Sequence, residues 1–280
     1  MDCVLLASGS KGNCIYVGND TDAVVIDAGV GYLYRTLLEY QLPAANVRAL
    51  LVTHEHADHV RSAKAFLKSA QIPVAASGGT LSGMERAGMI PASSDKILLG
   101  KGIEAEFGTL RTAAFATYHD AGEPTGFIID DGDSRIGVCL DTHKVTDAML
   151  AALSLCDAVV LESNYAASAM KSDTFDRCKM CRSCGAACGG NCAVLRPYPR
   201  YLKDRIIQDG HLSNEASSEV LSRLKKSVGT VALAHLSENY NRPNLARETA
   251  EDATDGGDVR IFVSDQCPMY REKRMVRFSV

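Results

Sequence analysis

Four potential metal ligands lie within six residues in the first quarter of the chain. The segment His54-Glu55-His56-Ala57-Asp58-His59 directly follows the apolar run Leu50–Thr53, which has the character of a strand end. Imidazole nitrogens and carboxylate oxygens are ligands that zinc, manganese and iron accept. Side chains at the tip of a strand can converge on an ion without burying unpaired charge. The segment therefore predicts a metal site, in preference to histidines on a solvated loop or capping a helix.

Three further ligand types each follow a strand-like run elsewhere in the chain. His119 comes after Thr112–Tyr118, Asp141 after Ile136–Leu140, and His235 after Thr230–Ala234. Loops at one edge of a sandwich gather in space, so we expect these side chains to meet the first segment. Together they predict a site for two metal ions.

The elements that must position these residues alternate between strands and helices. Hairpins early in the chain and βα units late in it predict an α/β fold with two sheets covered by helices, a four-layer αββα sandwich. We expect one domain over residues 1–280, with residues 171–199 as a cysteine-rich insertion within it. Strands are predicted at Met1–Ala7, Cys14–Val17, Ala23–Asp27, Val47–Thr53, Ile72–Ala76, Leu110–Tyr118, Gly126–Asp130, Ile136–Leu140, Ala158–Leu161, Thr230–Ala234 and Val259–Val263. Helices are predicted at Tyr32–Tyr40, from Val60, at Asn214–Lys226 and at Leu245–Ala253.

Composition limits the class of protein. The 280 residues are 46% hydrophobic and carry a formal net charge of −4, so nucleic-acid binding would need a local basic patch. The N-terminal run places Asp2 where a signal peptide needs positive charge, and no stretch approaches the roughly 20 apolar residues of a membrane span. We expect a cytoplasmic protein with no membrane association, and infer no obligate protein partner.

The order of these ligands resembles a known family. The pattern H-x-H-x-D-H, followed by a single His, a single Asp and a final His, is similar to that of metallo-β-lactamase-fold hydrolases. Further segments resemble the WalJ/YycJ group of that family, whose members are regarded as DNA exonucleases. These segments are Ser8-Gly9-Ser10-Lys11-Gly12-Asn13-Cys14, Asp27-Ala28-Gly29, His119-Asp120-Ala121, Glu162-Ser163-Asn164-Tyr165, Gly210-His211-Leu212-Ser213-Asn214 and His235-Leu236-Ser237-Glu238.

The resemblance implies a division of the ligands between two divalent ions, zinc or manganese. It gives the first ion to His54, His56 and His119, the second to Asp58, His59 and His235, and makes Asp141 the bridge. Two ions about 3.5–4 Å apart hold a hydroxide and neutralise charge on a transferring phosphoryl group. Asp58 would orient or deprotonate the attacking water. His211, in a context that resembles tRNA 3′-processing nucleases, would be the general acid for the leaving oxygen.

Several residues are candidates for substrate contact. Ser10 and Asn13 lie in a small-residue turn that could approach an anion through backbone N–H groups, or could be a plain hairpin turn. Asn164 and Tyr165 follow a strand end and could touch substrate. His143 stands where the group is expected to have a small residue, and is either a surface residue or an additional group that reaches towards substrate.

Five cysteines cluster in the insertion. Cys178, Cys181, Cys184, Cys188 and Cys192 have the spacing C-x2-C-x2-C-x3-C-x3-C, which fits a [4Fe–4S] cluster or a structural zinc site and does not choose between them. A loop with reactive thiols is the alternative. The other five cysteines are scattered, and we expect them to be small buried side chains. They are Cys3, Cys14, Cys139, Cys156 and Cys267.

Basic and aromatic residues surround the insertion. Among them are Arg200, Lys203, Arg205, Tyr198 and Tyr201, a combination suited to phosphates and stacked bases, although a charge run is often only a solvated face. We therefore expect Arg200 and Lys203 to contact nucleic acid.

The leading hypothesis is a binuclear metal-dependent phosphodiesterase, a DNA exonuclease with a 5′ start. DNA and the polarity rest on the resemblance alone. The alternatives are an RNA-processing nuclease of the tRNA 3′-processing type, a small-molecule metallo-hydrolase, and a redox or metal sensor with a vestigial hydrolase site.

A metal site in the insertion has a spectroscopic consequence. If the cysteines hold an iron–sulfur cluster, anaerobically purified protein should absorb in the visible range through thiolate-to-iron charge transfer. If they hold zinc, elemental analysis should find metal beyond that of the histidine site. A colourless protein with no such additional metal would contradict both forms of the hypothesis.

Overall fold

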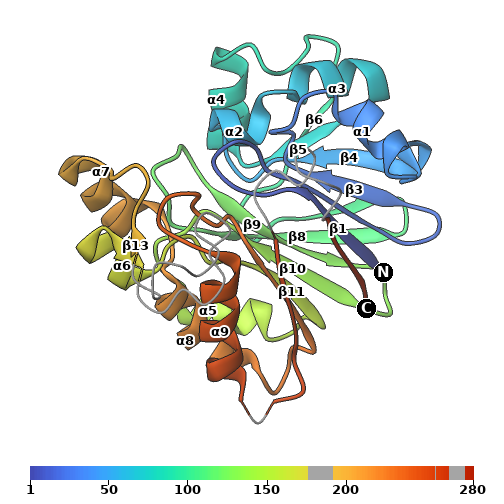
Figure 1. The fold of residues 1–280 in the computed structure, drawn as a ribbon. Coiled ribbons are helices and arrows are strands. Elements are labelled where there is room, and N and C mark those ends of the chain that lie inside the picture. The colour runs from blue at the N-terminus through green and yellow to red at the C-terminus, as the bar shows by residue number, and fades with distance from the viewer. Residues whose placement is uncertain (176–191, 256, 265–274) are drawn as a thin grey trace.

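Two sheets of seven strands each form the centre of the molecule (Figure 1). The computed structural model describes residues 1–175, 192–255, 257–264 and 275–280. The strand order of the first sheet is β16-β1-β2-β3-β4-β5-β6, and that of the second is β15-β14-β11-β10-β9-β8-β7. The first sheet comprises β1 (Asp2–Ala7), β2 (Cys14–Gly18), β3 (Ala23–Ile26), β4 (Val47–Leu51), β5 (Val74–Ala76), β6 (Lys96–Leu98) and β16 (Val276–Ser279). The second comprises β7 (Glu104–Phe107), β8 (Leu110–Ala116), β9 (Thr125–Asp130), β10 (Arg135–Cys139), β11 (Ala158–Glu162), β14 (Thr230–Ala234) and β15 (Arg260–Val263).

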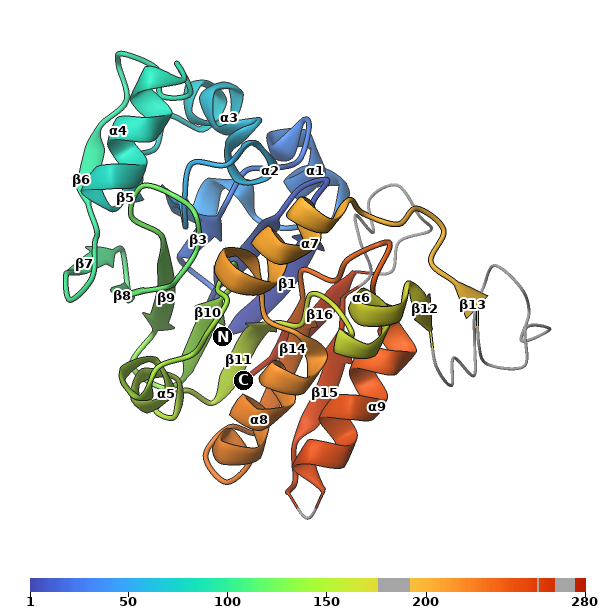
Figure 2. The same cartoon turned by 90° about the vertical axis from the view of Figure 1, so that its left-hand side faces the viewer.

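Helices cover the outer face of each sheet, as Figures 1 and 2 show from two sides. Those against the first sheet are α1 (Leu33–Glu39), α3 (Ala63–Ala70) and α4 (Gly78–Arg86), with the short α2 (Ala57–Val60) and η1 (Ala44–Asn46). Those against the second are α5 (Asp147–Leu153), α8 (Asn214–Leu224) and α9 (Pro243–Thr254). The predicted four-layer αββα sandwich is thus confirmed.

Three apolar layers hold the sandwich together. The inner layer lies between the sheets and includes Leu5, Ile26, Phe127 and Ile129, all fully buried. Two outer layers lie between each sheet and its helices. Strands such as β11 and β14 are buried along their whole length because both faces of the second sheet are covered, which is why their sequences are continuous apolar runs.

The direction of the strands determines where the site forms. Strands β3, β4 and β5 run parallel, as do β10, β11 and β14, while β8 and β10 are each antiparallel to β9. The carboxyl ends of β8, β10, β11 and β14 therefore lie at one edge of the second sheet. The loops that carry His119, Asp141 and His235 begin at this edge, whereas the segment His54–His59 follows β4 of the first sheet.

Several elements were not predicted from the sequence. The structure adds β16 (Val276–Ser279), which pairs antiparallel with β1 at the edge of the first sheet, and the short strands β6 and β7. It also divides the helix predicted from Val60 into α2 and α3, because the N–H of Ser62 donates to the carbonyl of Ala28 in a neighbouring loop. Helices α4 and α5 are capped by Ser77 and Thr146, whose side chains accept a hydrogen bond from the backbone three residues on.

The predicted insertion has folded flanks. Lys171 and Ser172 belong to α6 (Ala167–Ser172), and β12 (Thr174–Phe175) pairs with β13 (Cys192–Ala193). Phe175 and Val194 pack with Tyr165 and Tyr240 in a small apolar cluster of their own. Cys178, Cys181, Cys184 and Cys188 lie outside the described residues, so the metal site proposed there stays a prediction.

The scattered cysteines behave as expected where they are described. Cys3, Cys14, Cys139 and Cys156 are buried among apolar side chains, and burial raises the pKa of each thiol. Cys267 lies outside the described residues. Within the described part of the chain, no helix has the length and apolar character needed to span a bilayer.

Candidate active site

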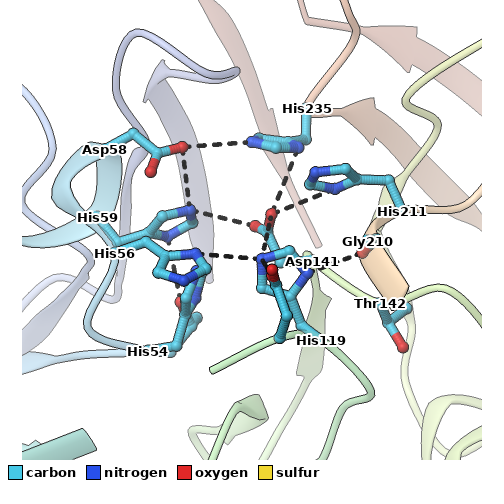
Figure 3. Close-up of polar contacts among 12 residues, drawn as sticks. His54, His56, Asp58, His59, His119, Asp141, Thr142, Gly210, His211 and His235 are labelled. Carbon is cyan, nitrogen blue, oxygen red and sulfur yellow. Dashed lines mark hydrogen bonds and ion pairs between the residues drawn. The ribbon is translucent and has the colours of Figure 1, made fainter. Parts of the chain in front are cut away.

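The predicted ligands converge at the edge where the strands end (Figure 3). His54 and His56 follow β4, His119 follows β8, and Asp141 lies two residues after β10. His235 comes directly after β14. Residues that are up to 181 positions apart in the sequence, from His54 to His235, thus meet in one cluster.

Two groups of three ligands can be distinguished by their distances. In the first group, His54, His56 and His119 lie with ring centroids 4.6–5.0 Å apart, and His56 Nδ1 is 3.2 Å from His119 Nε2. In the second, Asp58 Oδ2 is 3.6 Å from His59 Nε2 and 3.7 Å from His235 Nε2. Each group offers ligand atoms close enough to hold one metal ion.

Asp141 lies between the two groups. Its Oδ2 is 3.2 Å from His59 Nε2 in the second group, and its Oδ1 is 3.9 Å from His119 Nε2 in the first. The carboxylate is 2% exposed. This position between both groups is the one expected for the bridging ligand that the family resemblance implies.

The donor atoms fit a pair of divalent cations. Nε2 of His54 and Nε2 of His235 are buried and have no hydrogen-bond partner among the described residues. A buried polar atom without a partner costs roughly 1–3 kcal/mol, and metal coordination would remove that cost. All the donors are imidazole nitrogens or carboxylate oxygens, the set that zinc and manganese accept.

The second nitrogen of four rings is held by the protein. Nδ1 of His59 lies 2.7 Å from Asp27 Oδ2, Nδ1 of His119 lies 2.8 Å from the Gly210 carbonyl, and Nδ1 of His235 lies 3.1 Å from Glu162 Oε1. Nδ1 of His54 lies 3.1 Å from the Thr53 hydroxyl. Such contacts fix the tautomer and the orientation of a ring, so that its Nε2 points to the metal position.

The electrostatics of the cluster favour bound cations. Burial alone would raise the pKa of the Asp141 carboxyl, but His235 and His59 hold it well below its ordinary value. Burial alone would lower the pKa of His235, but the carboxylates of Asp141, Asp58 and Glu162 raise it to about 10. The carboxylates thus stay ionised and create a negative potential that divalent ions can neutralise.

Asp27 and Glu162 contact predicted site residues, and the sequence alone assigned no role to either. Glu162 ends β11, is fully buried, and approaches Nδ1 of His211 at 2.6 Å as well as Nδ1 of His235. Asp27 follows β3 and contacts His59 and Thr53. Both lie in segments on which the family resemblance rested, and a carboxylate directly at the end of a buried strand was the signal available for each.

A close approach of two loops fixes Asp58 and His59. A Cβ atom on Gly29 would lie 1.7 Å from the Asp58 carbonyl oxygen, so only glycine fits there. Asn13 donates its backbone N–H to that same oxygen and places Nδ2 3.0 Å from His59 Nε2. Asn13 is 1% exposed and therefore lies beside the second group of ligands rather than on an open surface.

A pocket of about 250 Å³ opens onto the ligands. Ser10 and Asn164 line it, as does His211, and Asn164 also donates to the His235 carbonyl at 2.7 Å. One wall is formed by the helix α7 (Arg200–Arg205), which continues into the π-helical turn η2 (Ile206–Gly210). Figure 2 shows this helix above the carboxyl ends of the strands.

Three residues predicted to contact substrate are placed elsewhere. Tyr165 is 7% exposed and packs in the small apolar cluster of the insertion flanks. Lys203 pairs with Asp173 at 2.5 Å, and the almost fully exposed Arg200 pairs with Asp204 at 3.8 Å. These side chains are outside the pocket lining because α7 turns the face that carries Leu202 and Arg205 towards the pocket.

His143 also lies outside the pocket lining. Its backbone N–H donates to the Tyr118 carbonyl at 2.9 Å, and its ring lies edge-on to that of Tyr118 with centroids 6.1 Å apart. It packs against the residue that precedes His119 and is half-buried, and both interpretations of this residue stay predictions.

Comparison with known proteins agrees with the geometry. Residues 22–235 match the model of the beta-lactamase superfamily domain. The chain belongs to this superfamily. The superfamily is hydrolytic, so the chain is a hydrolytic enzyme.

Among its relatives, the exodeoxyribonuclease YycJ of Bacillus anthracis is 30% identical over 248 residues, which cover 87% of this chain and 85% of the relative. The exodeoxyribonuclease WalJ of Streptococcus pneumoniae is 27% identical over 92% of this chain and 90% of the relative.

Solved structures of this superfamily fold share the architecture. The metallo-beta-lactamase fold protein YhfI of Bacillus subtilis superposes with a TM-score of 0.70 at 12% identity, over 99% of both chains. Zinc-bound PqqB of Methylobacterium extorquens gives a TM-score of 0.68 at 13% identity, over 100% of both chains. At these identities the likeness concerns the fold alone.

The contact between Asp27 and His59 leads to a prediction about metal affinity. Replacing Asp27 by Asn removes the charge that orients Nδ1 of His59, and loss of such a partner weakens metal binding by about 10–100-fold. Competition titration with a zinc chelator would measure this change. The matched control is Asp147→Asn, because Asp147 is exposed and pairs with the surface residue Arg223 at 3.0 Å instead of with a metal ligand. Unchanged zinc affinity in Asp27→Asn would contradict the role of this contact.

Proposed function

We propose that this protein is a binuclear metal-dependent phosphodiesterase that degrades DNA exonucleolytically from a 5′ end. The observation that carries the proposal is the pair of three-ligand groups on either side of Asp141, at the base of an open pocket. Relatives at 27–30% identity that are named exodeoxyribonucleases support nucleic acid as the substrate class.

The first ion would be held by His54, His56 and His119, and the second by Asp58, His59 and His235, with Asp141 shared. The ions are zinc or manganese in this proposal. When bound, two such ions supply positive charge to the phosphoryl oxygens and lower the pKa of water for attack. The remaining steps concern side chains of the chain itself.

Asp58 is proposed to orient the attacking water and accept its proton. Its carboxylate lines the pocket and is partly exposed, with 23% of the side chain accessible, so a water molecule can reach it. Burial alone would raise its pKa, but His235 and His59 lower it, so the carboxylate stays ionised and able to accept a proton.

His211 is proposed to give a proton to the leaving oxygen. Its Nδ1 lies 2.6 Å from Glu162 Oε1, which leaves Nε2 for the pocket that the ring lines. Burial alone would raise the pKa of Glu162, but His211 lowers it, so the carboxylate beside the His211 ring stays ionised. The arrangement of an imidazole backed by a buried carboxylate is suited to general-acid catalysis.

The substrate class can be tested with one panel. End-labelled double-stranded DNA, single-stranded DNA, RNA and a tRNA precursor are incubated with the protein and manganese or zinc. We expect stepwise release of nucleotides from 5′ ends of DNA, with loss of activity in Asp58→Ala. Degradation of none of these by the wild-type protein would contradict a nuclease function, whereas cleavage confined to the tRNA precursor would favour RNA processing.

The proton donor can be tested through the leaving group. Loss of a general acid lowers the rate by about 10²–10⁴-fold when the leaving oxygen needs protonation. His211→Ala should therefore slow cleavage of DNA to this extent but have little effect on p-nitrophenyl phosphodiesters, whose leaving group departs without a proton. Equal losses on both kinds of substrate would assign His211 a positioning role instead.

A further inference from the structure

The wall of the pocket formed by α7 and η2 carries a stripe of apolar side chains opposite the candidate metal ligands. Tyr198, Leu202 and Ile206 recur at intervals of four residues and all line the pocket. Their neighbours Tyr201 and Ile207 do not line the pocket and are 74% and 45% exposed. Leu202 of α7 and Ile206 of η2, together with Tyr198 just before α7, thus present an apolar surface to a site lined by imidazoles and carboxylates.

Contacts with Tyr240 hold the first residue of the stripe, Tyr198, in place. The backbone N–H of Tyr198 donates to the Tyr240 hydroxyl at 2.8 Å, and the two rings pack with centroids 4.9 Å apart. Tyr240 is fully buried and donates its own hydroxyl to Asp173 at 2.6 Å, which in turn pairs with Lys203. Because this network fixes the wall before substrate arrives, little ordering is required on binding.

The same wall also carries a positively charged side chain. Among the described residues that line the pocket, Arg205 is the single lysine or arginine. Its Nε lies 2.6 Å from Asp120 Oδ2, and Asp120 directly follows the ligand His119. The guanidinium is 58% exposed, and exposed ion pairs contribute little to stability, so it can exchange its partner for an incoming phosphate.

We infer that this wall is a binding subsite for the nucleoside next to the scissile phosphate, with Arg205 as a ligand of that phosphate. An apolar and aromatic face suits a base and sugar, since bases stack on such side chains without regard to sequence. The arginine and the candidate metal positions both attract the phosphodiester. The inference rests on the proposed function and adds to it the residues that distinguish a nucleotide from other phosphodiesters.

The experiment compares substrates that differ only in the nucleoside. Hydrolysis of methyl p-nitrophenyl phosphate and of the 3′ and 5′ p-nitrophenyl phosphate esters of thymidine is followed with manganese. The leaving group is the same in all three. In the wild type, kcat/KM for the better thymidine ester should exceed that of the methyl ester by about 10-fold, as expected for one stacked base.

Variants then separate the two parts of the subsite. Leu202→Ala and Ile206→Ala should each reduce the ratio of thymidine to methyl ester by about 3–10-fold. Tyr201→Ala should leave the ratio unchanged, because this exposed side chain is outside the pocket lining. Arg205→Ala should lower kcat/KM for both esters equally, by about 10–100-fold, because both carry the phosphodiester. Arg223→Ala is its matched control, since Arg223 of α8 forms an exposed ion pair with Asp147 of α5.

The outcomes distinguish the subsite from the function. Hydrolysis of all esters with a ratio near one, or a ratio that Leu202→Ala and Ile206→Ala leave unchanged, overturns the subsite while the phosphodiesterase function stands. Hydrolysis of none of the esters and of no DNA overturns the function itself. If the loss in Arg205→Ala came only from the freed Asp120 carboxylate, the double variant Arg205→Ala/Asp120→Asn would regain activity, and such recovery would overturn the phosphate contact.

Discussion

The rest of this site depends on the buried negative charge of Asp141, which lies between the two ligand groups. Asp141 is almost fully enclosed, yet its carboxylate stays ionised because imidazoles surround it. An ionised carboxylate away from water is tolerated only when positive charge lies close to it. This requirement is met by the surrounding imidazole rings, the carboxylates behind them and the proposed metal ions. Removal of any one of these groups would leave a buried charge without its partner.

The backbone at the strand ends is adapted to the same requirement. Asp27, Asp141 and His235 all have left-handed backbone conformations, with φ of 63°, 49° and 56°. Such conformations are uncommon for residues other than glycine and persist where neighbouring contacts hold them. At His235 the backbone N–H donates to Ser8 Oγ, and the carbonyl accepts from Asn164. The sheets therefore stabilise turns that direct these side chains into the cluster.

The sequence predicted the architecture and the ligand types because both depend on local signals. Apolar runs that end in His or Asp are visible in the chain, and the parallel arrangement of the strands brings those ends together. The surroundings of Tyr165 and Lys203 do not follow from local signals. Their exposure depends on how the chain returns from the insertion and on the rotation of α7, which only long-range packing decides. Strand β16 was missed because its partner β1 lies at the opposite end of the sequence. The role of Glu162 was missed because its contacts with His211 and His235 join residues distant in the sequence.

The π-helical turn η2 limits how the chain length can vary. Here the N–H of His211 donates to the carbonyl of Ile206, five residues earlier. The carbonyl of Gly210 accepts a hydrogen bond from Nδ1 of His119. Removing one residue would convert the turn to an α-helical register and rotate the residues after it by roughly 100°. The Gly210 carbonyl and the His211 ring would then both leave their positions. Insertions and deletions are therefore not expected to be tolerated between Ile206 and His211.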